Sequence, residues 1–373
     1  MSYLDKLLHG VEVEWKTLGE VCILSRGRVM SKEYLAENAG EYPVYSSQTA
    51  NNGEIGKIKT FDHDGEAVTW TTDGANAGTV FHRTGKFSIT NVCGLIKVKN
   101  IEELNYKFLF YWLSIEAKKH VYSGMGNPKL MSNQMAKIPI PIPPLSVQKE
   151  IVRILDSFTE LTAELTAELT AELTARKKQY NYYREKLLSF EEGDVEWKTL
   201  GEVVDVFTGG EAPLNCIKGD KPEGIFKYPV YGNGAEIYGY ADSYRIDKDA
   251  VTISSIGANT GTIYFRNAFF TPIIRLKVII PKYNNLLPRY LYHYLNSITI
   301  SSKSSSVPNM NASDVKRIKI PVPPIEEQER IVSILDKFDI LTTSISEGLP
   351  KEIELRKKQY EYYRDVLLTF PKN

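Results

Sequence analysis

Residues 13–20 read VEWKTLGE, and the same eight letters return unchanged at residues 195–202. Other segments recur with a similar shift of 180 to 186 residues: YPVY at 42–45 and 228–231, GANAGT at 74–79 with GANTGT at 257–262, PKL at 128–130 with PNM at 308–310, and ARKKQYNYYREKLLSF at 175–190 with LRKKQYEYYRDVLLTF at 355–370. A repeated shift of this kind indicates two copies of one folding unit. The chain therefore carries the same globular and helical parts twice.

The size and composition of the chain suit two ordinary domains with connecting helices. It has 373 residues, of which 42% are hydrophobic, enough to build cores. Three scattered cysteines match neither a metal-binding spacing nor an even disulfide set, which suits a reducing compartment. The first ten residues lack the apolar core of a signal peptide, and no apolar run is long enough for a membrane helix. We predict a cytoplasmic protein.

The net charge is zero, with 46 basic and 46 acidic residues. This balance argues weakly against nucleic acid as a partner. Residues 197–325, however, hold 15 lysines and arginines against 10 acidic residues. Local positive charge is sufficient for contacts to DNA, so the overall balance does not decide the partner.

Each globular copy is predicted to contain short strands, a helix and an extended exit. The strands are expected at 66–71 and 78–81 in the first copy, and at 250–254 and 261–265 in the second. The helices are expected at 106–114 and 288–296, where aromatic residues would pack on the sheet. The proline-rich stretches 138–144 and 318–324 exclude helix and predict extended chain.

Long helices are predicted after the two proline-rich stretches. IPIPIPPLSVQKEIVRILDSF at 138–158 matches IKIPVPPIEEQERIVSILDKF at 318–338, and apolar residues follow the prolines at spacings of three and four. Three Thr-Ala-Glu-Leu units at 162–173 consist largely of strong helix formers and predict a rigid rod. A helix over 146–190 would be about 65 Å long. Gly348-Leu-Pro350 is predicted to break or kink the second helix.

Two similar amphipathic helices in one chain most simply pack antiparallel. Asp156 precedes Tyr180 by the same 24 positions as Asp336 precedes Tyr360, so the two arms match in length. Residues 6–8 also align with 186–188, as if a circular repeat had been cut open.

We therefore predict an α+β fold in which two similar mixed α/β domains are joined by two long antiparallel helices, with a pseudo-two-fold circular repeat. The predicted parts are a first domain at 1–145, a central helical spacer at 146–193, a second domain at 194–325 and a C-terminal helical spacer at 326–373.

This arrangement resembles the DNA-specificity subunits of type I restriction–modification systems, over essentially the full length. RKKQYNYYR (176–184), RKKQYEYYR (356–364) and the two proline-rich helix starts carry the resemblance, and the Thr-Ala-Glu-Leu tract resembles the type IC branch. The resemblance implies two target-recognition domains that each read half of a bipartite sequence in double-stranded DNA. It also implies that the helices set the spacer and bind two methyltransferase (modification) subunits, with restriction (motor and nuclease) subunits joining the complex.

No catalytic or metal site is predicted on this chain. Asn127-Pro-Lys only approaches an adenine methyltransferase motif, Gly53–Lys57 has the wrong spacing for a phosphate loop, and Asp62-His-Asp64 suits a solvated surface. The resemblance implies that the assembled complex is an adenine-N6 methyltransferase and ATP-dependent endonuclease, whose S-adenosylmethionine, ATP and Mg are used by partner subunits. The alternative is a two-domain structural adaptor that binds proteins, which the neutral charge favours.

Polar loops supply the candidate DNA contacts, because Asn and Gln pair with adenine edges while Arg and Lys suit guanine or phosphate. These candidates are Arg26, Arg28, Ser46, Ser47, Gln48, Asn51, Asn76, Asn127, Lys129, Asn233, Arg245, Asn259, Lys303, Asn309 and Asn311. Asn76 and Asn259 have a second interpretation as left-handed turn residues. The Gly/Ser-rich loops 123–129 and 301–311 have a second interpretation as plain surface.

The nearly identical RKKQY segments predict a docking surface for two equivalent partners. The candidate partner contacts are Arg176, Lys177, Lys178, Tyr182, Arg356, Lys357, Lys358 and Tyr362. Contact with DNA in the spacer is the alternative for these basic runs.

Overall fold

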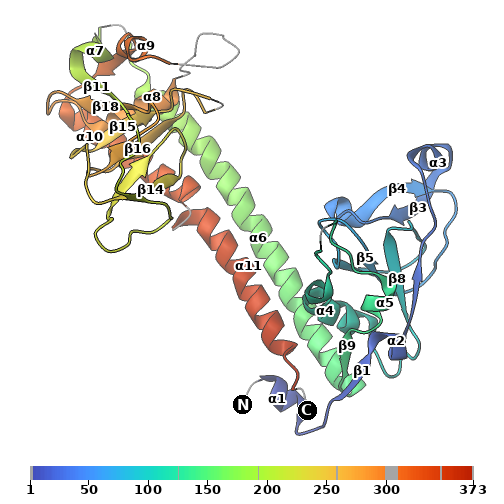
Figure 1. The fold of residues 1–373 in the computed structure, drawn as a ribbon. Helices are drawn as coiled ribbons and strands as arrows, with labels where there is room; N and C mark the ends of the chain where they lie inside the picture. Colours follow the sequence, from blue (N-terminus) through green and yellow to red (C-terminus); the bar gives the residue numbers. More distant parts are fainter. Residues whose placement is uncertain are drawn as a thin grey trace. The chain divides into compact units, whose positions relative to one another are not determined.

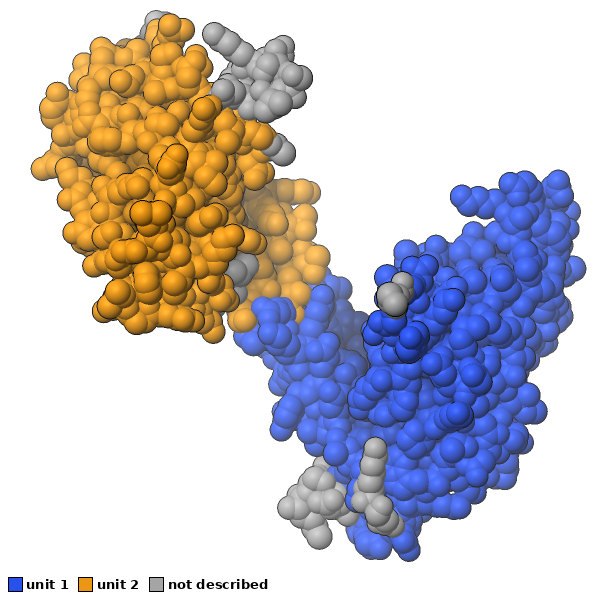
Figure 2. All heavy atoms as spheres, in the orientation of Figure 1, with its two compact units in different colours: residues 1–167, 354–373 blue, residues 168–353 orange. Residues whose placement is uncertain are grey.

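The computed structural model describes residues 3–124, 126–191, 193–257, 259–298, 310–344 and 347–371. The chain divides into two compact units, residues 1–167 with 354–373, and residues 168–353 (Figure 2). Each unit contains one globular domain with a core of buried aromatic and aliphatic side chains.

The first domain combines two sheets with a helix. One sheet has the order β2 (Cys22–Arg26), β8 (Cys93–Val98), β5 (Ala67–Thr71) and β6 (Val80–Arg83), all antiparallel. The other has the order β4 (Glu54–Ile58), β3 (Ala39–Tyr45) and β7 (Ser88–Ile89). Helix α4 (Tyr106–Glu116) packs on β5 and β6, and the short helices are α1 (Tyr3–Leu8), α2 (Leu18–Val21), α3 (Lys32–Glu37) and α5 (Ser132–Met135).

The second domain repeats this framework. One sheet has the order β11 (Val204–Thr208), β18 (Lys277–Pro281), β15 (Ala250–Ile253) and β16 (Ile263–Arg266). The other has the order β12 (Cys216–Ile217), β14 (Ile237–Ala241), β13 (Tyr228–Tyr231) and β17 (Thr271–Pro272). Helix α8 (Pro288–Ser297) lies beside β15 and β16 (Figure 1), and the short helices are α7 (Leu200–Val203) and α9 (Ala312–Lys316). The copies differ in the segment that precedes YPVY. After β2 the first domain forms helix α3, whereas after β11 the second domain forms strand β12.

The repeated VEWKTLGE segments begin each domain on a strand that pairs with its exit. Strand β1 (Glu14–Thr17) pairs with β9 (Pro139–Ile142), and β10 (Glu196–Thr199) pairs with β19 (Lys319–Val322). The prolines fit because each ribbon has only two strands, so one side of each strand makes no ladder bonds. The predicted extended exits are confirmed, as are the predicted helices, now seen as α4 and α8.

A buried glutamine joins each domain to the long helix that follows it. Gln148 is fully buried; its Oε1 accepts from the Asn105 amide (2.9 Å), and its Nε2 donates to the carbonyls of Glu103 (2.7 Å) and Pro143 (2.9 Å). In the second copy Gln328 makes the same three bonds, with Leu287, Asn285 and Pro323. The glutamine thus fixes the start of the long helix against the start of α4 or α8.

A repeated aspartate provides a second link about two helical turns further along. Asp156 accepts from Lys107 Nζ (2.6 Å) and from the Tyr111 hydroxyl (2.8 Å), both on α4. Asp336 lies 2.5 Å from His293 Nε2 and accepts from Arg289 Nε (2.7 Å), both on α8. Burial alone would raise the pKa of Asp336, but the bonds from His293 and Arg289 outweigh it and hold that pKa below its usual range.

The long helices are α6 (Leu145–Leu188), α10 (Ile325–Thr343) and α11 (Gly348–Leu367). In the first unit Phe158 packs on Tyr363 (centroids 5.7 Å) and Thr159 bonds the Tyr360 hydroxyl (3.0 Å), an antiparallel pairing of α6 with α11. In the second unit the matching Phe338 of α10 stacks with two tyrosines of α6, Tyr180 (6.0 Å) and Tyr183 (5.6 Å).

The predicted break in the second helix is confirmed. Helix α10 ends at Thr343, and α11 begins at Gly348, whose φ is +78°. A Cβ there would lie 2.5 Å from the carbonyl oxygen of Ile340, so the position needs glycine. Pro350 lies in the first turn of α11, where its missing N–H costs nothing.

The end of α11 returns to the first domain, as the circular repeat predicts. Phe370 packs on Phe108 (5.9 Å) and Trp112 (6.0 Å), and Trp15 Nε1 donates to the carbonyl of Pro371 (3.0 Å). Leu4 and Leu8 of α1 belong to the same core cluster, which also contains residues 367 and 368. The corresponding Leu188 and Phe190 pack in the second core, so each helical arm ends on the domain that comes next in the circle.

We predict that Gln148→Leu destabilises the first domain by at least about 2 kcal/mol. The substitution leaves buried backbone groups unpaired, at a cost of roughly 1–3 kcal/mol for each. Chemical denaturation of the purified protein measures the change. Lys149→Leu at the exposed neighbouring position is the control, expected to stay within about 0.5 kcal/mol. Equal losses in both variants would contradict a specific role for the buried amide.

Candidate nucleic-acid interface

Several candidate side chains of the first domain lie close together around the end of strand β5. The Arg26 guanidinium donates to Thr72 Oγ1 (2.7 Å), just beyond β5. Backbone bonds from Gly74 to Pro128 (3.0 Å) and from Leu130 to Thr72 (2.8 Å) hold the GANAGT turn against the 122–130 segment. Arg26, Asn76, Asn127 and Lys129 are exposed beside these contacts. The structure therefore brings these four predicted contacts into one neighbourhood.

The left-handed positions in the GANAGT turn are glycines. Gly74 and Gly78 have φ of +85° and +80°, and Gly257 and Gly261 of the second turn have +76° and +90°. Asn76 is not among the residues with positive φ, and its carbonyl accepts from the Thr79 amide (3.1 Å). The turn therefore does not need Asn76 for a left-handed conformation. Base contact by Asn76 and Asn259, both exposed, stays a prediction.

The loop that follows the first YPVY segment has two consecutive asparagines at its tip. Asn51 and Asn52 have φ of +48° and +53°, in the left-handed region that asparagine tolerates. Ser46 Oγ accepts from Thr90 Oγ1 (2.8 Å), and Gln48 Nε2 donates to the Glu54 carbonyl (2.5 Å). Asn51 and Gln48 are exposed at this tip, while Ser46 and Ser47 are half-buried at its base.

The guanidinium of Arg28 already makes hydrogen bonds within the domain. It donates to the Tyr34 hydroxyl (3.1 Å) and to Asp62 Oδ2 (3.1 Å). The hydrogen bond with Tyr34, aided by Asp62, raises the pKa of Arg28, although burial opposes it. Because Asp62 already pairs with this guanidinium, a phosphate at Arg28 would have to compete with a carboxylate.

Two candidate asparagines of the second domain are engaged by backbone groups. Asn233 Oδ1 accepts from the Ser255 amide (2.7 Å), and its Nδ2 donates to the Ile274 carbonyl. Asn311 caps α9 by accepting from the amides of residues 313 and 314, both at 3.0 Å. These bonds favour supporting roles over base contact. Lys303 and Asn309 lie outside the described residues.

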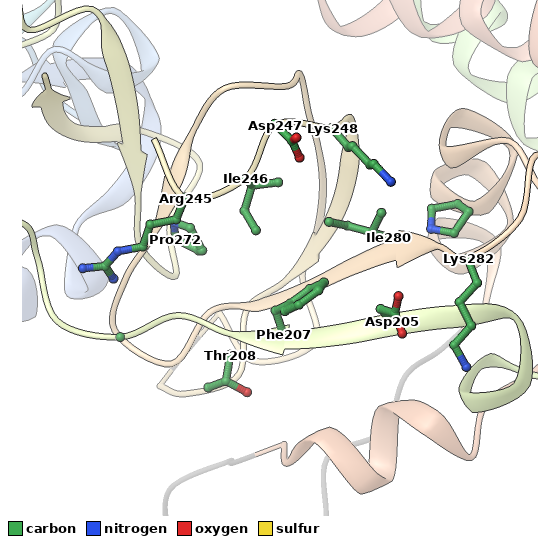
Figure 3. Close-up of a pocket in the computed structure, with 12 residues that line it drawn as sticks. Asp205, Phe207, Thr208, Arg245, Ile246, Asp247, Lys248, Pro272, Ile280 and Lys282 are labelled. Atoms are coloured by element: carbon green, nitrogen blue, oxygen red, sulfur yellow. The ribbon is translucent and has the colours of Figure 1, made fainter. Parts of the chain in front are cut away.

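Arg245 lines a cavity of about 350 Å³ along the edge strand β11. Figure 3 shows Arg245 at one end and Lys282 at the other, with Phe207 between them. Asp205 and Asp247 also line the cavity, so its charge is mixed and does not suit a phosphate inside it. Arg245 donates to the Glu211 carbonyl (3.2 Å) and is exposed, which leaves a phosphate contact outside the cavity as a prediction.

Sequence reasoning missed a pair of buried arginines beneath the loops after YPVY. The guanidinium carbon of Arg83 lies 3.6 Å from the ring centroid of Tyr45, and Nη2 donates to the Asn52 carbonyl (2.8 Å). Arg266 repeats this with Tyr231 (3.9 Å) and the carbonyls of residues 234 (3.0 Å) and 235 (3.2 Å). The shift of 183 residues that relates the GANAGT turns also relates these arginines, which was the available signal.

The repeated segments RKKQYNYYR (176–184) and RKKQYEYYR (356–364) each contain both packed and exposed tyrosines. Tyr180 and Tyr183, like Tyr360 and Tyr363, contact the facing helix. Tyr182 and Tyr362 are 58% and 66% exposed. The other partner candidates lie on the same helical segments: Lys177, Lys178, Lys357 and Lys358 are exposed, while Arg176 and Arg356 are half-buried. In the first unit Tyr362 also lines a mainly apolar groove of about 530 Å³, between residues 153–158 and 362–367.

Neither a metal-binding cluster nor a membrane-spanning helix is found among the described residues. Within them, no group of three or more His, Cys, Asp or Glu side chains could hold a metal ion. No helix in the same ranges is long and apolar enough to cross a bilayer. Burial raises the pKa of the Cys22 and Cys93 thiols to about 12, opposite to the shift that activates a nucleophile.

Two stretches of the chain, residues 10–175 and 192–355, match the family model of the type I restriction modification DNA specificity domain. The chain belongs to this family of type I specificity subunits. It is 38% identical to the specificity subunit of the type I restriction enzyme EcoR124I/EcoR124II from Escherichia coli, over 412 aligned positions covering 100% of this chain and 98% of that protein. The resemblance inferred from the repeated motifs is thus confirmed, while the type IC subdivision stays a prediction.

Solved structures support the same fold. A chain from a structure on complex assembly and conformational transition of the type I restriction–modification system aligns with a TM-score of 0.66 at 17% identity, over 96% of this chain and 98% of that one. The S subunit of M. genitalium aligns with a TM-score of 0.56 at 20% identity, over the full length of both chains. The predicted α+β fold with two similar domains is confirmed for this specificity subunit.

Proposed function

We propose that this specificity subunit recognises a bipartite sequence in double-stranded DNA, each domain reading one half. The observation that carries the proposal is the repetition of one framework with different loops. The sheets, the buried glutamines and the buried arginines match, whereas the segment before YPVY forms α3 in one domain and β12 in the other. One scaffold that carries two different loop sets suits two different half-sites.

Binding selection on random duplex DNA, with the methyltransferase subunit present, tests this function. We expect the selected molecules to share two short fixed sequences separated by a spacer of constant length. A protein-binding adaptor would enrich no sequence, and that result would contradict the proposal. S-adenosylmethionine, ATP and Mg would serve the partner subunits of the complex, an adenine-N6 methyltransferase and ATP-dependent endonuclease.

Exchanging residues 15–145 for the corresponding domain of another specificity subunit should change one half-site only. The framework that holds the loops lies within the exchanged segment, and the second domain has its own core. Methylation mapping of the assembled complex reads both half-sites at once. A simultaneous change in both would show that the domains do not read independently.

We also propose that the two RKKQY surfaces dock two methyltransferase subunits, and that restriction subunits join this assembly. Native mass spectrometry should show two methyltransferase subunits for each specificity chain. Charge reversal at Lys177, Lys178, Lys357 and Lys358 should weaken this assembly, because like charges would replace complementary ones. The control is reversal of Lys57 and Lys59 in the first domain. A saturated one-to-one complex would contradict two equivalent sites, and weaker DNA binding with intact assembly would favour the DNA-contact alternative.

The Thr-Ala-Glu-Leu tract lies within the continuous helix α6, and we propose that it sets the spacer length. Deleting Thr166–Leu169 removes four residues, or ~6 Å of helix, and rotates the remainder of the helix by ~40°. One base pair of duplex DNA advances ~3.4 Å and turns by roughly a tenth of a turn. The rotation therefore favours a spacer shorter by one base pair, with both half-sites unchanged. Methylation mapping measures the spacer, and an unaltered spacer would exclude this tract as the ruler.

A further inference from the structure

The turn between β17 and β18 has an unusual backbone. Ile274 and Arg275 have φ of +53° and +58°, consecutive left-handed residues of which neither is glycine or asparagine. A β-branched side chain is strongly disfavoured there, because its branches crowd the backbone. Strain of this kind persists only where surrounding contacts impose it, and it concentrates at functional sites.

The contacts that impose this backbone come from three other segments. The amides of Ile274 and Arg275 donate to the carbonyls of Gly210 (2.8 Å) and Gly209 (3.0 Å). Ser255 Oγ donates to the Arg275 carbonyl (2.6 Å), and Asn233 Nδ2 donates to the Ile274 carbonyl. Every polar backbone group of the two turn residues thus has a partner. We call these four hydrogen bonds the clamp. The clamp needs glycine at position 209, because a Cβ on Gly209 would lie 2.8 Å from the Ile273 nitrogen and keep the two segments apart.

The clamp directs the two side chains of the turn towards solvent. Ile274 is 47% exposed, and Arg275 is exposed beside it. Below them Lys277 is buried, with its Nζ donating to Thr208 Oγ1 (3.1 Å). Burial, followed by the nearby charge of Arg275, lowers the pKa of Lys277. This part of the domain therefore holds two basic groups close together, where an electronegative ligand would be favoured.

The first domain lacks the strain at the matching turn. Asn91 and Val92 occupy that place between β7 and β8, and neither is among the residues with positive φ. The common framework therefore does not require the left-handed pair. The strained turn is therefore one of the features that differ between the two domains, as is expected of an element that determines specificity.

We propose that the Ile274–Arg275 turn contacts the bases of the second half-site. Arg275 would donate to the O6 and N7 atoms of a guanine, and Ile274 would pack on a thymine methyl group nearby. Asn233 is then a positioning residue, which holds the turn rather than reading a base. The inference rests on the proposed function and names the residues that carry it in this domain.

Arg275→Ala in the assembled methyltransferase complex tests the guanine contact. Binding is measured against DNA with each base pair of the second half-site varied in turn. We expect discrimination at one guanine position to fall by roughly 5- to 150-fold, the range of a bidentate base contact. Arg245→Ala is the control, expected to weaken all sequences equally, as a phosphate contact does.

Equal weakening of every sequence by Arg275→Ala, or no change at any position, would overturn the inference. The proposed function has a separate readout, because the wild-type complex either selects a bipartite site or does not. If the wild-type complex selects no sequence, the proposed function and this inference both fall. If it selects one and Arg275→Ala leaves its profile unchanged, only the inference falls.

A comparison of Ile274→Gly with Ile274→Ala isolates the strain. Both remove the side chain and should reduce discrimination near the guanine position, but only glycine accepts positive φ without penalty. The glycine variant should therefore have the higher melting temperature, whereas glycine is normally the less stable of the two. Asn233→Ala should reduce discrimination at the same positions as the turn variants, since it releases the Ile274 carbonyl. A melting temperature that favours alanine, or full discrimination in both Ile274 variants, would contradict the proposal.

Discussion

The link between each domain and its long helix depends on one buried side-chain amide. Gln148 and Gln328 lie just inside the helices that begin after the prolines, and each satisfies three backbone groups that would otherwise be buried without a partner. Burying such groups unpaired costs more than a new bond would gain, so the joint has one favourable arrangement. Asp156 and Asp336 add a charged link on the same side, to α4 and α8. A domain held at two points about two helical turns apart cannot swivel freely on its helix.

These joints leave the rest of each domain free to differ. The links are made at the start of α4 or α8 and along the long helices, whereas the candidate DNA contacts in the domains lie at other places, at strand ends and in the loops between elements. The first domain therefore carries a short helix before YPVY and the second a strand, without any change in the joint. A strained turn such as Ile274–Arg275 is tolerated for the same reason, because its support comes from neighbouring loops and from Ser255 and Asn233.

The repeated motifs predicted the framework because its periodicity and its prolines act locally. The helices α4, α6, α8 and α10, the extended exits and the break before Gly348 all result from residues within a few positions of each other. The loops were less predictable. Asn233 resembles a base-reading residue in the sequence, yet its amide is bonded to groups 22 and 41 residues away. Arg83 and Arg266 end ordinary strands, and each is buried with its guanidinium against the tyrosine of a YPVY strand from the other sheet. Such pairings depend on how two sheets pack, which neither composition nor spacing reveals.

The partners of these buried polar side chains explain how the framework survives divergence. Gln148 bonds only main-chain atoms, and so does Gln328. Arg83 and Arg266 donate to the carbonyls of the loops above them while stacking on a tyrosine of the repeated YPVY segment. A carbonyl is present whatever side chain the loop residue carries. Substitutions in the loops therefore alter the surface offered to DNA without removing a partner from the buried groups, so that specificity can change while the support stays the same.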